Sequence, residues 1–382
     1  MSAQNIDVVW FAEIKWDYLR TRKQQLVRRR PDGLRVLFLE PFVRGRDNRY
    51  DIRDVDGIRV VTVPFIKSIP SGPGRTALNV PLARRLVDAS ARARVRGHLR
   101  RAGIDPAKSV FIISNVFAIG VASGFEPMRL VYDCNDAHAD FPGLPAWSRG
   151  HQEETLRRAG RVIVSARGLR EDAVRVRGAD RDVFVVGNGV DYPLFHRALA
   201  LRKRDPGARP CIGYLGAIAP WLDFELVAAA AASRPQWDFV LVGPVLPGAG
   251  PAVAKLSTQG NVSVRPAVSH DDVPRVLAGF DVGLIPFRST PLTAGVNPNK
   301  LYEYLAAGLP VVSTPFSPDV EADADVVALP GDAPGFVTAC ERFLSQREDA
   351  AARSRMEARA GAIASAHDWN LIAKEFWARA CG

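Results

Sequence analysis

Lys300 and Glu303 stand one helical turn apart, directly after an expected helix start. Asn297 is expected to cap this helix, and Pro298 to take its first position, where a missing N–H costs nothing. The N–H groups of Asn299 and Lys300 would then point out of the helix towards an anion. Lys300 could bind phosphates, and Glu303, on the same helix face, the hydroxyls of a ribose. The segment therefore predicts a nucleoside-diphosphate site, against the simpler interpretation of a capped helix with a surface Lys–Glu pair.

Short apolar runs alternate with helical patterns along almost the whole chain, which is typical of parallel α/β architecture. The strands expected in the first half are Val8–Phe11, Val36–Leu39, Ile58–Val63, Val110–Ser114, Leu130–Asp133, Val162–Ser165 and Val183–Val186. Those expected in the second half are Ile212–Leu215, Phe239–Val242, Val262–Val264, Val282–Ile285, Pro310–Ser313 and Val326–Ala328. The pattern restarts after the polar stretch 202–210. We therefore expect two doubly wound, Rossmann-like sheets facing across a cleft, with ligands at the carboxyl ends of their strands.

The domain boundaries follow from this restart. We expect an N-terminal Rossmann-like domain over residues 1–190, a hinge and linker over 191–210, a C-terminal Rossmann-like domain that carries the nucleotide site over 211–365 and a final helix over 366–382. An apolar stripe at helical spacing marks this last helix, formed by Trp369, Ile372, Phe376 and Trp377. Because such a stripe needs a partner surface, we expect the helix to cross back onto the N-terminal domain.

The composition is that of a soluble globular protein. Of the 382 residues, 47% are hydrophobic and 24% charged, which fits two domains of ordinary size. The four cysteines have no spacing typical of zinc sites or disulfides, so a reducing cytoplasm is expected. We expect neither a signal peptide nor a membrane-spanning helix, because no apolar run approaches the required length.

Positive charge is concentrated in the first third of the chain. Residues 1–110 hold 23 Lys and Arg against 11 Asp and Glu, whereas the remaining residues hold 28 and 30. Two basic groups fall on expected helices: Arg20, Arg22, Lys23 and Arg28–Arg30, and then Arg84, Arg85, Arg92, Arg94, Arg96, Arg100 and Arg101. Such a surface could bind anionic lipid, nucleic acid or an acidic substrate. We favour the anionic membrane surface, because no nucleic-acid-binding motif accompanies the charge. The simpler alternative is a solvated surface on which Arg replaces Lys. It would explain why the residues are Arg, but not why the excess of positive charge lies in the first third of the chain.

The loop 64–81 lies between these two basic groups. It is rich in Pro and Gly but carries the apolar residues Phe65, Ile66, Ile69 and Leu78. These side chains could rest on a membrane, or they could pin the loop to its own domain.

Three segments, in this order along the chain, resemble the two-domain glycosyltransferases of the GT-B fold. Val186–Asp191, with Phe195 after it, is similar to the interdomain hinge of that superfamily. Ile212–Gly216 resembles the first strand and phosphate-facing loop of its nucleotide-sugar domain. Asn297–Val312 is similar to its pattern P-x-K-x-x-E-Y-x-A-x-G-x-P-V-V. The resemblance covers most of the chain and implies transfer of a sugar from a nucleotide donor.

Two departures narrow the resemblance. The large retaining group of that superfamily carries a Glu eight positions before the residue equivalent to Glu303, and this chain has Gly295 there. That group also carries Arg and Lys after the loop equivalent to Gly216, where this chain has Ala217–Trp221. At these two positions, and in the segment Leu130–Asp136, the chain instead resembles the xanthan-type glucuronosyltransferase and the teichuronic-acid biosynthesis glycosyltransferases. The resemblance implies that Asp136 is the general base of an inverting reaction. Trp16–Tyr18 followed by Arg22–Gln25 also resembles the teichuronic-acid group.

The residues around Asp136 suit a base but allow other roles. The position after the expected strand Leu130–Asp133 should lie at a carboxyl end of the sheet. Crowding with Asp133 and Asp140 could raise the pKa of one carboxyl in this loop towards the working range of a base. Asp136 could equally cap a helix or form an Asx turn. His138 is the alternative base, because histidine titrates near neutrality.

The same resemblance supplies a donor site. It implies that the nucleotide is held by Gly216, Ala217, Ile218, Phe287, Asn299, Lys300 and Glu303, although Phe287 could be plain core. We expect a nucleotide sugar, UDP-linked, as co-substrate, with no cofactor. Asp54–Asp56 and Asp323–Asp325 match the metal-binding D-x-D pattern of a different transferase fold, but so short a match in polar stretches carries little weight. No obligatory metal is expected.

The expected function is transfer of a sugar to a lipid-linked or glycan acceptor in cell-envelope or exopolysaccharide synthesis. We expect this at the inner face of the cell membrane, with the protein bound peripherally and without nucleic acid. Two alternatives remain open at this point: a retaining transferase of the same fold, and a non-catalytic scaffold that keeps the fold, which Gly295 motivates. An oxidoreductase is disfavoured, since no Gly-x-Gly-x-x-Gly follows an expected strand.

Overall fold

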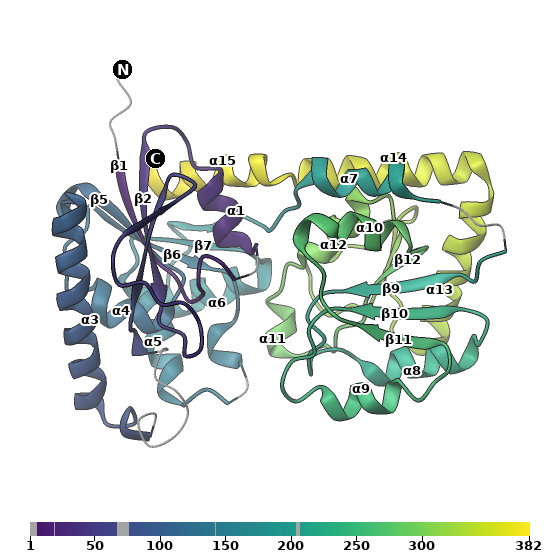
Figure 1. The fold of residues 1–382 in the computed structure, drawn as a ribbon, viewed down its shortest axis with the longest axis horizontal. Helices are drawn as coiled ribbons and strands as arrows, with labels where there is room; N and C mark the ends of the chain where they lie inside the picture. The colour runs from purple at the N-terminus through teal and green to yellow at the C-terminus, as the bar shows by residue number, and fades with distance from the viewer. Residues whose placement is uncertain (1–5, 19, 67–75, 142, 204–206) are drawn as a thin grey trace. The chain divides into compact units, whose positions relative to one another are not determined.

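The computed structural model describes residues 6–18, 20–66, 76–141, 143–203 and 207–382, and it divides the chain into two compact units (Figure 1). The first unit comprises Met1–Gly187 and Ile372–Gly382, and the second comprises Asn188–Leu371. Each unit is built on one mainly parallel sheet with helices on its faces, so the expected fold class is confirmed.

The first unit contains an eight-stranded sheet in the order β3-β4-β2-β1-β5-β6-β7-β8. Its strands are β1 (Ile6–Phe11), β2 (Leu34–Pro41), β3 (Arg53–Val55), β4 (Ile58–Val63), β5 (Ser109–Ile113), β6 (Arg129–Cys134), β7 (Arg161–Val164) and β8 (Val183–Val185). Its helices are α1 (Arg22–Arg28), α3 (Pro81–Ala102), α4 (Ile119–Ala122), α5 (Trp147–Arg158) and α6 (Arg167–Arg177). Short 3-10 turns lie at Pro106–Lys108, Val116–Ala118 and His138–Asp140. The central strand β1 is buried along almost its whole length, because helices cover both faces of a parallel sheet.

Strand β3 was not expected, and it accounts for one of the two D-x-D matches. It pairs antiparallel with β4 through a turn at Asp56 and Gly57, whose φ angles are 55° and 74°. Left-handed backbone at both central residues is the geometry of a tight hairpin turn, and Asp-Gly is a preferred sequence for it. Asp54 accepts a hydrogen bond from the Gly57 N–H at 2.9 Å, and Asp56 pairs with Arg28 at 2.8 Å. Asp54 and Asp56 therefore form and anchor a hairpin.

The second unit contains a fully parallel six-stranded sheet in the order β11-β10-β9-β12-β13-β14. Its strands are β9 (Cys211–Leu215), β10 (Asp238–Val242), β11 (Val262–Arg265), β12 (Val282–Ile285), β13 (Val311–Ser313) and β14 (Val327–Ala328). Its helices are α7 (Tyr192–Leu201), α8 (Phe224–Ser233), α9 (Gly250–Leu256), α10 (Val273–Ala278), α11 (Pro291–Ala294), α12 (Asn299–Ala306), α13 (Ala333–Glu348) and α14 (Ala350–Ala366). The direction of winding reverses between β9 and β12. In open α/β sheets this reversal is where ligands bind, beyond the carboxyl ends of the strands.

The expected linker 191–210 is wrong over half of its length. Helix α7 occupies Tyr192–Leu201 and belongs to the second unit, with Phe195 and Ala198 buried in that unit's core. Apolar residues at helical spacing were present in this stretch, but the polar residues after it dominated the prediction. The boundary between the units instead lies between Gly187 and Asn188.

The final helix, α15 (Trp369–Cys381), returns to the first unit from Ile372 onward, as expected. The Phe376 ring stacks on Trp10 of β1 at a centroid distance of 5.6 Å. The Trp377 indole N–H donates to the carbonyl of Leu26 at 2.9 Å. Both aromatic rings are buried, so the apolar stripe completes the core of the first unit.

Asp88 of α3 is a buried carboxyl with an unusual environment. It packs so closely on α4 that a Cβ atom at Gly120 would overlap its Oδ2. Its Oδ1 has no hydrogen-bond partner in the part of the chain that the structure describes. Burial raises the pKa of Asp88 to about 7, against the lowering effect of Arg92.

This carboxyl is expected to make stability depend on pH. Between about pH 4 and 7 the folded protein keeps the proton that the unfolded chain releases, so stability falls as pH rises. From pH 5 to pH 8 we expect a loss of about 2–3 kcal/mol in the free energy of unfolding, measured with urea. Asp88→Asn should remove this loss, whereas Asp180→Asn, at an exposed carboxyl, should keep it. An unchanged pH dependence in Asp88→Asn would contradict the assignment.

Candidate functional site

Lys300 lies at the winding reversal of the second unit, over two aromatic rings. Its ammonium is 5.6 Å from the centre of the Tyr214 ring and 5.9 Å from that of Phe287. Within the described residues it has no hydrogen-bond or ion-pair partner. Burial lowers the pKa of Lys300, and the nearby Glu303 only partly opposes this. A half-buried cation with no ion pair within the described residues favours binding of an anion, which would offset the cost of its partial burial.

Glu303 shows the complementary property on the same helix. Burial raises the pKa of its carboxyl, and Lys300 opposes the rise. No hydrogen bond to its carboxylate exists within the described residues. Hydrogen-bond donors such as sugar hydroxyls would satisfy this group.

The start of α12 differs from the expected cap. Pro298, not Asn297, is the residue that precedes the helix, and no side chain caps it. The Asn297 side chain instead accepts from the Asn188 N–H at 3.0 Å and donates to the Tyr302 hydroxyl at 3.1 Å. The Asn297 side chain therefore bonds to residues outside the helix start instead of capping the helix, as the local sequence pattern had predicted. The N–H groups of Asn299 and Lys300 have no partner within the described residues, so the expected anion-binding geometry of the helix start is kept.

Two glycines make room beside the Lys300 side chain. Gly216, directly after β9, has φ 142°, and a Cβ there would overlap Cε and Nζ of Lys300. Gly243, directly after β10, has φ 152°, and a Cβ there would overlap the carbonyl of Gly216. Both conformations strongly favour glycine. The backbone at the end of β9 thus approaches the ammonium more closely than a side chain would allow, and the backbone at the end of β10 packs against that of Gly216.

The other expected donor residues fall into two groups. Ala217 is half-buried at the same loop, and its carbonyl accepts from the Tyr214 hydroxyl at 2.7 Å. Phe287 is mostly core, packed on Phe316 at 4.9 Å, but its ring faces the Lys300 ammonium. Ile218 is fully buried, and its N–H and carbonyl bond to Pro244 and Leu246. The expected contact of Ile218 with a nucleotide stays a prediction, and in this structure the residue is fully buried.

Asp136 lies in the first unit, in the turn after β6. Its half-buried carboxylate accepts a hydrogen bond from the side-chain amide of Asn135. Its backbone carbonyl accepts from the His138 N–H at 2.8 Å and lies 2.9 Å from Nδ1 of the His138 ring. The turn thus fixes the backbone around Asp136 and ties His138 to it. Asp136 is half-exposed at a carboxyl end of the sheet, and Nδ1 of His138 is engaged by the backbone.

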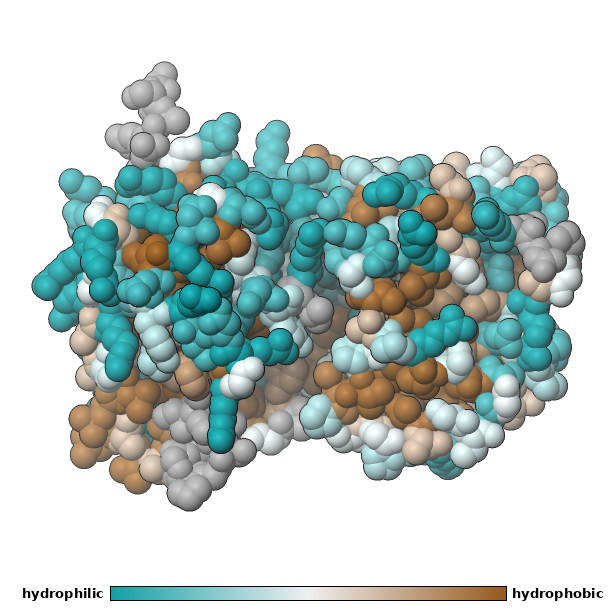
Figure 2. All heavy atoms as spheres, in the orientation of Figure 1, coloured by the Kyte–Doolittle hydropathy of each residue, from teal (hydrophilic) through white to brown (hydrophobic). Residues whose placement is uncertain are grey.

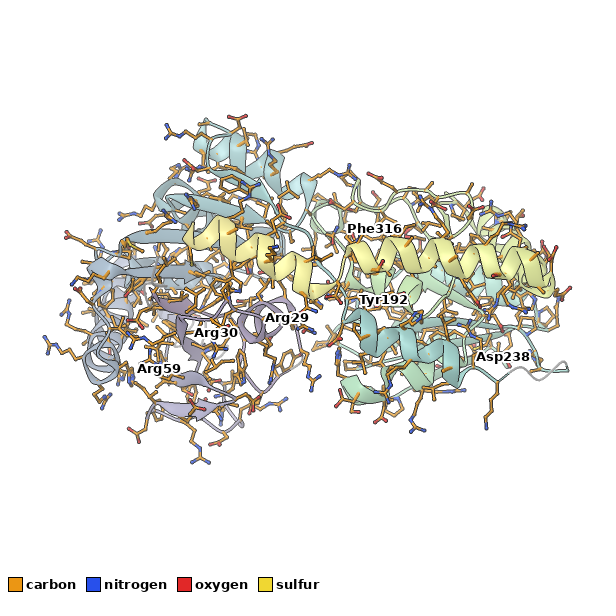
Figure 3. All side chains as sticks on the ribbon, turned by 90° about the horizontal axis from the view of Figure 1, so that it is seen from above. Arg29, Arg30, Arg59, Tyr192, Asp238 and Phe316 are labelled. Atoms are coloured by element: carbon orange, nitrogen blue, oxygen red, sulfur yellow. The ribbon has the colours of Figure 1, made fainter. Side chains whose placement is uncertain are left out.

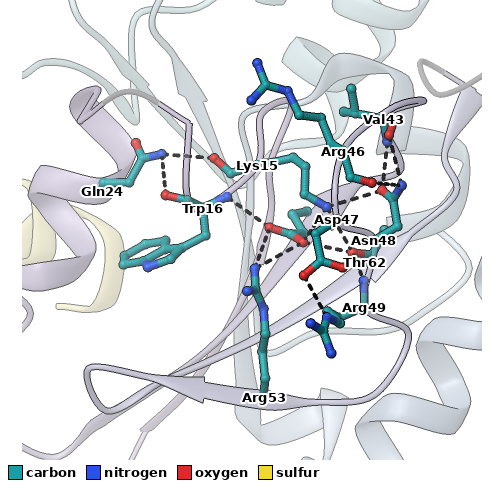
Figure 4. A network of polar contacts seen from close by, with 11 residues as sticks. Lys15, Trp16, Gln24, Val43, Arg46, Asp47, Asn48, Arg49, Arg53 and Thr62 are labelled. Atoms are coloured by element: carbon teal, nitrogen blue, oxygen red, sulfur yellow. Dashed lines mark hydrogen bonds and ion pairs between the residues drawn. The ribbon is translucent and has the colours of Figure 1, made fainter. Parts of the chain in front are cut away.

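A buried polar network lies at the carboxyl ends of β1 and β2 (Figure 4). Glu40 is its centre: it pairs with Lys15 at 2.8 Å and accepts from the Thr62 hydroxyl at 2.8 Å and the Trp16 N–H at 2.9 Å. Gln24 of α1 donates to the carbonyls of Lys15 and Trp16 at 3.2 and 3.3 Å. The members of this network bond to one another, so it serves to hold the segment between β1 and α1 in place.

The basic residues of α1 do not form the expected surface. Arg22 and Lys23 are buried, with Arg22 paired to Asp133 at 3.0 Å. Other arginines end on backbone carbonyls: Arg30 donates to Gly57 at 2.8 Å, and Arg59 to Ala102 at 3.0 Å (Figure 3). A sequence shows charge but not burial, so much of the charge excess is structural and only part of it can face a partner.

Several neighbours of the two sites were missed at the sequence level. Gly243 directly follows a buried strand, as Gly216 does. This position after a strand is the sequence signal that could have identified it. The ring of Tyr214 could not be placed under Lys300 without the sheet register. Asn135 contacts Asp136, Lys23 contacts Asn135 and Glu13 pairs with Lys23, and the apolar strands before Glu13 and Asn135 were the signal for the location of these two residues.

Comparisons with known proteins agree with this geometry. Residues 209–346 match the profile of the family described as "Glycosyl transferases group 1". The teichuronic acid biosynthesis glycosyltransferase TuaH of Bacillus subtilis (strain 168) is 29% identical over 267 residues, and the match spans 65% of each protein. Sucrose-phosphate synthase from Thermosynechococcus elongatus superposes with a TM-score of 0.74 at 15% identity, over 97% of both chains. HepE from Anabaena, solved with UDP and glucose, has a TM-score of 0.67 at 18% identity, over 97% of this chain and 98% of its own. The chain therefore has the GT-B fold, and residues 209–346 of its second unit are similar to the glycosyl transferases group 1 family.

Proposed function

We propose that the protein transfers a sugar from a UDP-linked donor to a lipid-linked or glycan acceptor. The observation that carries this proposal is the half-buried Lys300 ammonium, which faces two aromatic rings beside an open helix start and has no hydrogen-bond or ion-pair partner within the described residues. A diphosphate would supply the missing negative charge, and ribose hydroxyls would donate to Glu303. The structure of HepE with UDP and the name of the teichuronic acid relative support this donor and acceptor chemistry.

The proposed reaction is an inverting displacement. Asp136 accepts the proton of the acceptor hydroxyl as its oxygen forms a bond to the anomeric carbon of the sugar. The bond between that carbon and the diphosphate oxygen breaks, and its electron pair leaves with UDP. Lys300 and the α12 N–H groups stabilise the charge that develops on the leaving group. NMR of the product anomer tests this stereochemistry, and retention of configuration would contradict it.

A thermal-shift panel with UDP, GDP, ADP, CMP and NAD tests the donor. UDP at about 100 times its dissociation constant should stabilise the folded protein by about 2.7 kcal/mol. The other nucleotides serve as controls of comparable charge or size. If only GDP or ADP stabilises the protein, that nucleotide and not UDP is the one carried by the donor. If no nucleotide changes the melting temperature, the proposal is contradicted.

The start of α3 is the surface that we propose for the membrane. Val80, Leu82 and Leu86 are exposed there, beside the exposed Arg85, and Figure 2 shows hydrophobic residues gathered at this end of the helix. An apolar ridge flanked by arginine fits an anionic lipid surface, at which a lipid-linked acceptor would be found. No helix in the described residues is long and apolar enough to cross a bilayer. Residues 67–75 of the loop considered above lie outside the described residues, whereas its Phe65, Ile66 and Leu78 are buried in the first unit.

Sedimentation with phosphatidylglycerol vesicles tests this surface. Leu82→Glu combined with Leu86→Glu should lower vesicle binding at least about tenfold, because each leucine would lose about 1 kcal/mol or more of burial in lipid. Leu371→Glu, at another exposed leucine, should leave binding unchanged. Equal binding by all three proteins, or equal binding to neutral phosphatidylcholine, would contradict the assignment.

A further inference from the structure

The first turn of α1 carries four consecutive polar side chains that are almost completely buried. Arg22, Lys23, Gln24 and Gln25 are between 1% and 4% exposed. Burial of charges and amides costs free energy unless each has a partner, so their partners indicate what the burial serves. Three of them have partners that support the fold: Gln24 bonds to the carbonyls of Lys15 and Trp16, Arg22 pairs with Asp133, and Gln25 bonds to Arg29.

Lys23 instead reaches the neighbour of Asp136. Its ammonium pairs with Glu13, which follows β1, and donates to Oδ1 of Asn135 at 3.2 Å. The Nδ2 of Asn135 donates to Oδ2 of Asp136. Glu13, Lys23, Asn135 and Asp136 therefore form one continuous chain of contacts across the carboxyl ends of β1 and β6, ending at a half-exposed carboxylate.

The chemistry of this chain determines the orientation of the Asn135 amide. A lysine ammonium can only donate, so the carbonyl oxygen of the amide must face Lys23. The NH₂ group then points to Asp136, where it bonds most strongly to an ionised carboxylate. The backbone of Asn135 is held separately, because its carbonyl accepts from the Ser165 hydroxyl at 3.0 Å. Lys23 thus acts on the direction of the amide rather than on the position of the main chain.

We infer that Asn135, oriented by Lys23, is a positioning residue that holds the Asp136 carboxylate in one orientation and stabilises its ionised form. The inference rests on the proposed function, in which this carboxylate accepts the acceptor proton. A base must be ionised before it can take a proton, and a fixed carboxylate needs no reorganisation during the reaction. The Lys23–Glu13 pair carries no net charge, so it orients the amide without adding a free charge beside the base.

Other charged or titratable groups surround the same turn. They are the Arg22–Asp133 pair, the Cys134 thiol, the His138 ring and Asp172 of α6. Burial raises the pKa of Cys134 to about 12, so the thiol stays neutral and does not compete for the Asn135 amide. The Asn135 amide donates a direct hydrogen bond to the Asp136 carboxylate, and the loss of this bond is what a change of Asn135 would test.

An NMR titration of the full chain, labelled with ¹³C at the aspartate side-chain carboxyls, tests the inference. The Asp136 signal is the one that disappears in Asp136→Asn. In Asn135→Ala its titration midpoint should rise by about 0.5–1 pH unit, because a hydrogen bond to the ionised form is lost. Lys23→Met should also raise it, because the amide loses its fixed orientation. Ser165→Ala is the matched control, since it removes the bond to the backbone of Asn135 and should leave the midpoint unchanged.

An unchanged midpoint in Asn135→Ala would overturn the inference, whatever the behaviour of Lys23→Met. If Lys23→Met does not fold, because Glu13 is left buried without its cation, Asn135→Ala decides alone. The titration uses no substrate, so its result is separate from that of the proposed function. Full turnover by Asp136→Asn together with a raised midpoint in Asn135→Ala would keep the coupling and remove Asp136 as the base.

Discussion

Asp136→Asn is expected to lower sugar transfer by about 10²–10⁴-fold, because the asparagine amide cannot accept the proton of the acceptor hydroxyl. The measurement is transfer from the UDP-sugar that stabilises the protein most to lipid-linked acceptors in a membrane extract. Affinity for UDP, measured by calorimetry, should stay within about twofold of the unchanged protein, since the carboxylate belongs to the first unit and the nucleotide site to the second.

Asp140→Asn is the matched control for this change. Asp140 lies in the same loop, but its carboxylate pairs with Arg149 at 2.8 Å, so its replacement should leave transfer nearly unchanged. Equal activity in Asp136→Asn and the unchanged protein would exclude Asp136 as the base. A loss of activity that follows a loss of folding in the circular dichroism spectrum would point to a structural role instead.

Lys300→Ala is expected to weaken UDP binding by about 10–100-fold, which corresponds to the 1.5–3 kcal/mol of a hydrogen bond to a charged group. The same change should not lower the stability of the unliganded protein. Burial lowers the pKa of Lys300, which means that the folded protein holds this charge at a cost. In Lys300→Ala the affinity for UDP should therefore fall, while the free energy of unfolding of the unliganded protein stays the same or rises. That combination distinguishes a ligand-binding lysine from one that supports the fold.

Lys255→Ala provides the control within the same unit, because Lys255 is exposed on α9. It should change neither UDP affinity nor the free energy of unfolding. Unaltered affinity in Lys300→Ala would remove the diphosphate from this position. A marked loss of stability would show that the ammonium has a structural partner.

Most strands could be predicted because each is a short, continuous run of apolar residues, as in β1 and β9. Such runs indicate burial on both faces without any knowledge of the neighbours. β3 was missed because its residues are polar and its position depends on the Asp56-Gly57 turn. α7 was missed because the expected hinge and linker began at residue 191, although the polar stretch itself begins only at residue 202.

In the candidate site, too, the features set by local spacing could be predicted, and those that depend on distant residues could not. Lys300 and Glu303 could be predicted because helical spacing places them on one face, and the structure keeps that spacing. The cap was assigned wrongly because Asn297 bonds to Asn188, more than a hundred residues away. The burial of Arg22 and Lys23 could not be predicted, because it depends on the carboxylates of Asp133 and Glu13 in distant segments.

The return of the chain to the first unit has a consequence for biosynthesis. Ile372–Gly382 supply Phe376 and Trp377, which pack on Trp10 and bond to Leu26. A ribosome makes the chain from its N-terminus, so the unit that is begun first cannot complete its core until this last segment has been made. The second unit is continuous from Asn188 to Leu371 and has all of its residues earlier. A stop codon just before Ile372 would therefore leave the second unit whole and damage the first unit, at the opposite end of the sequence.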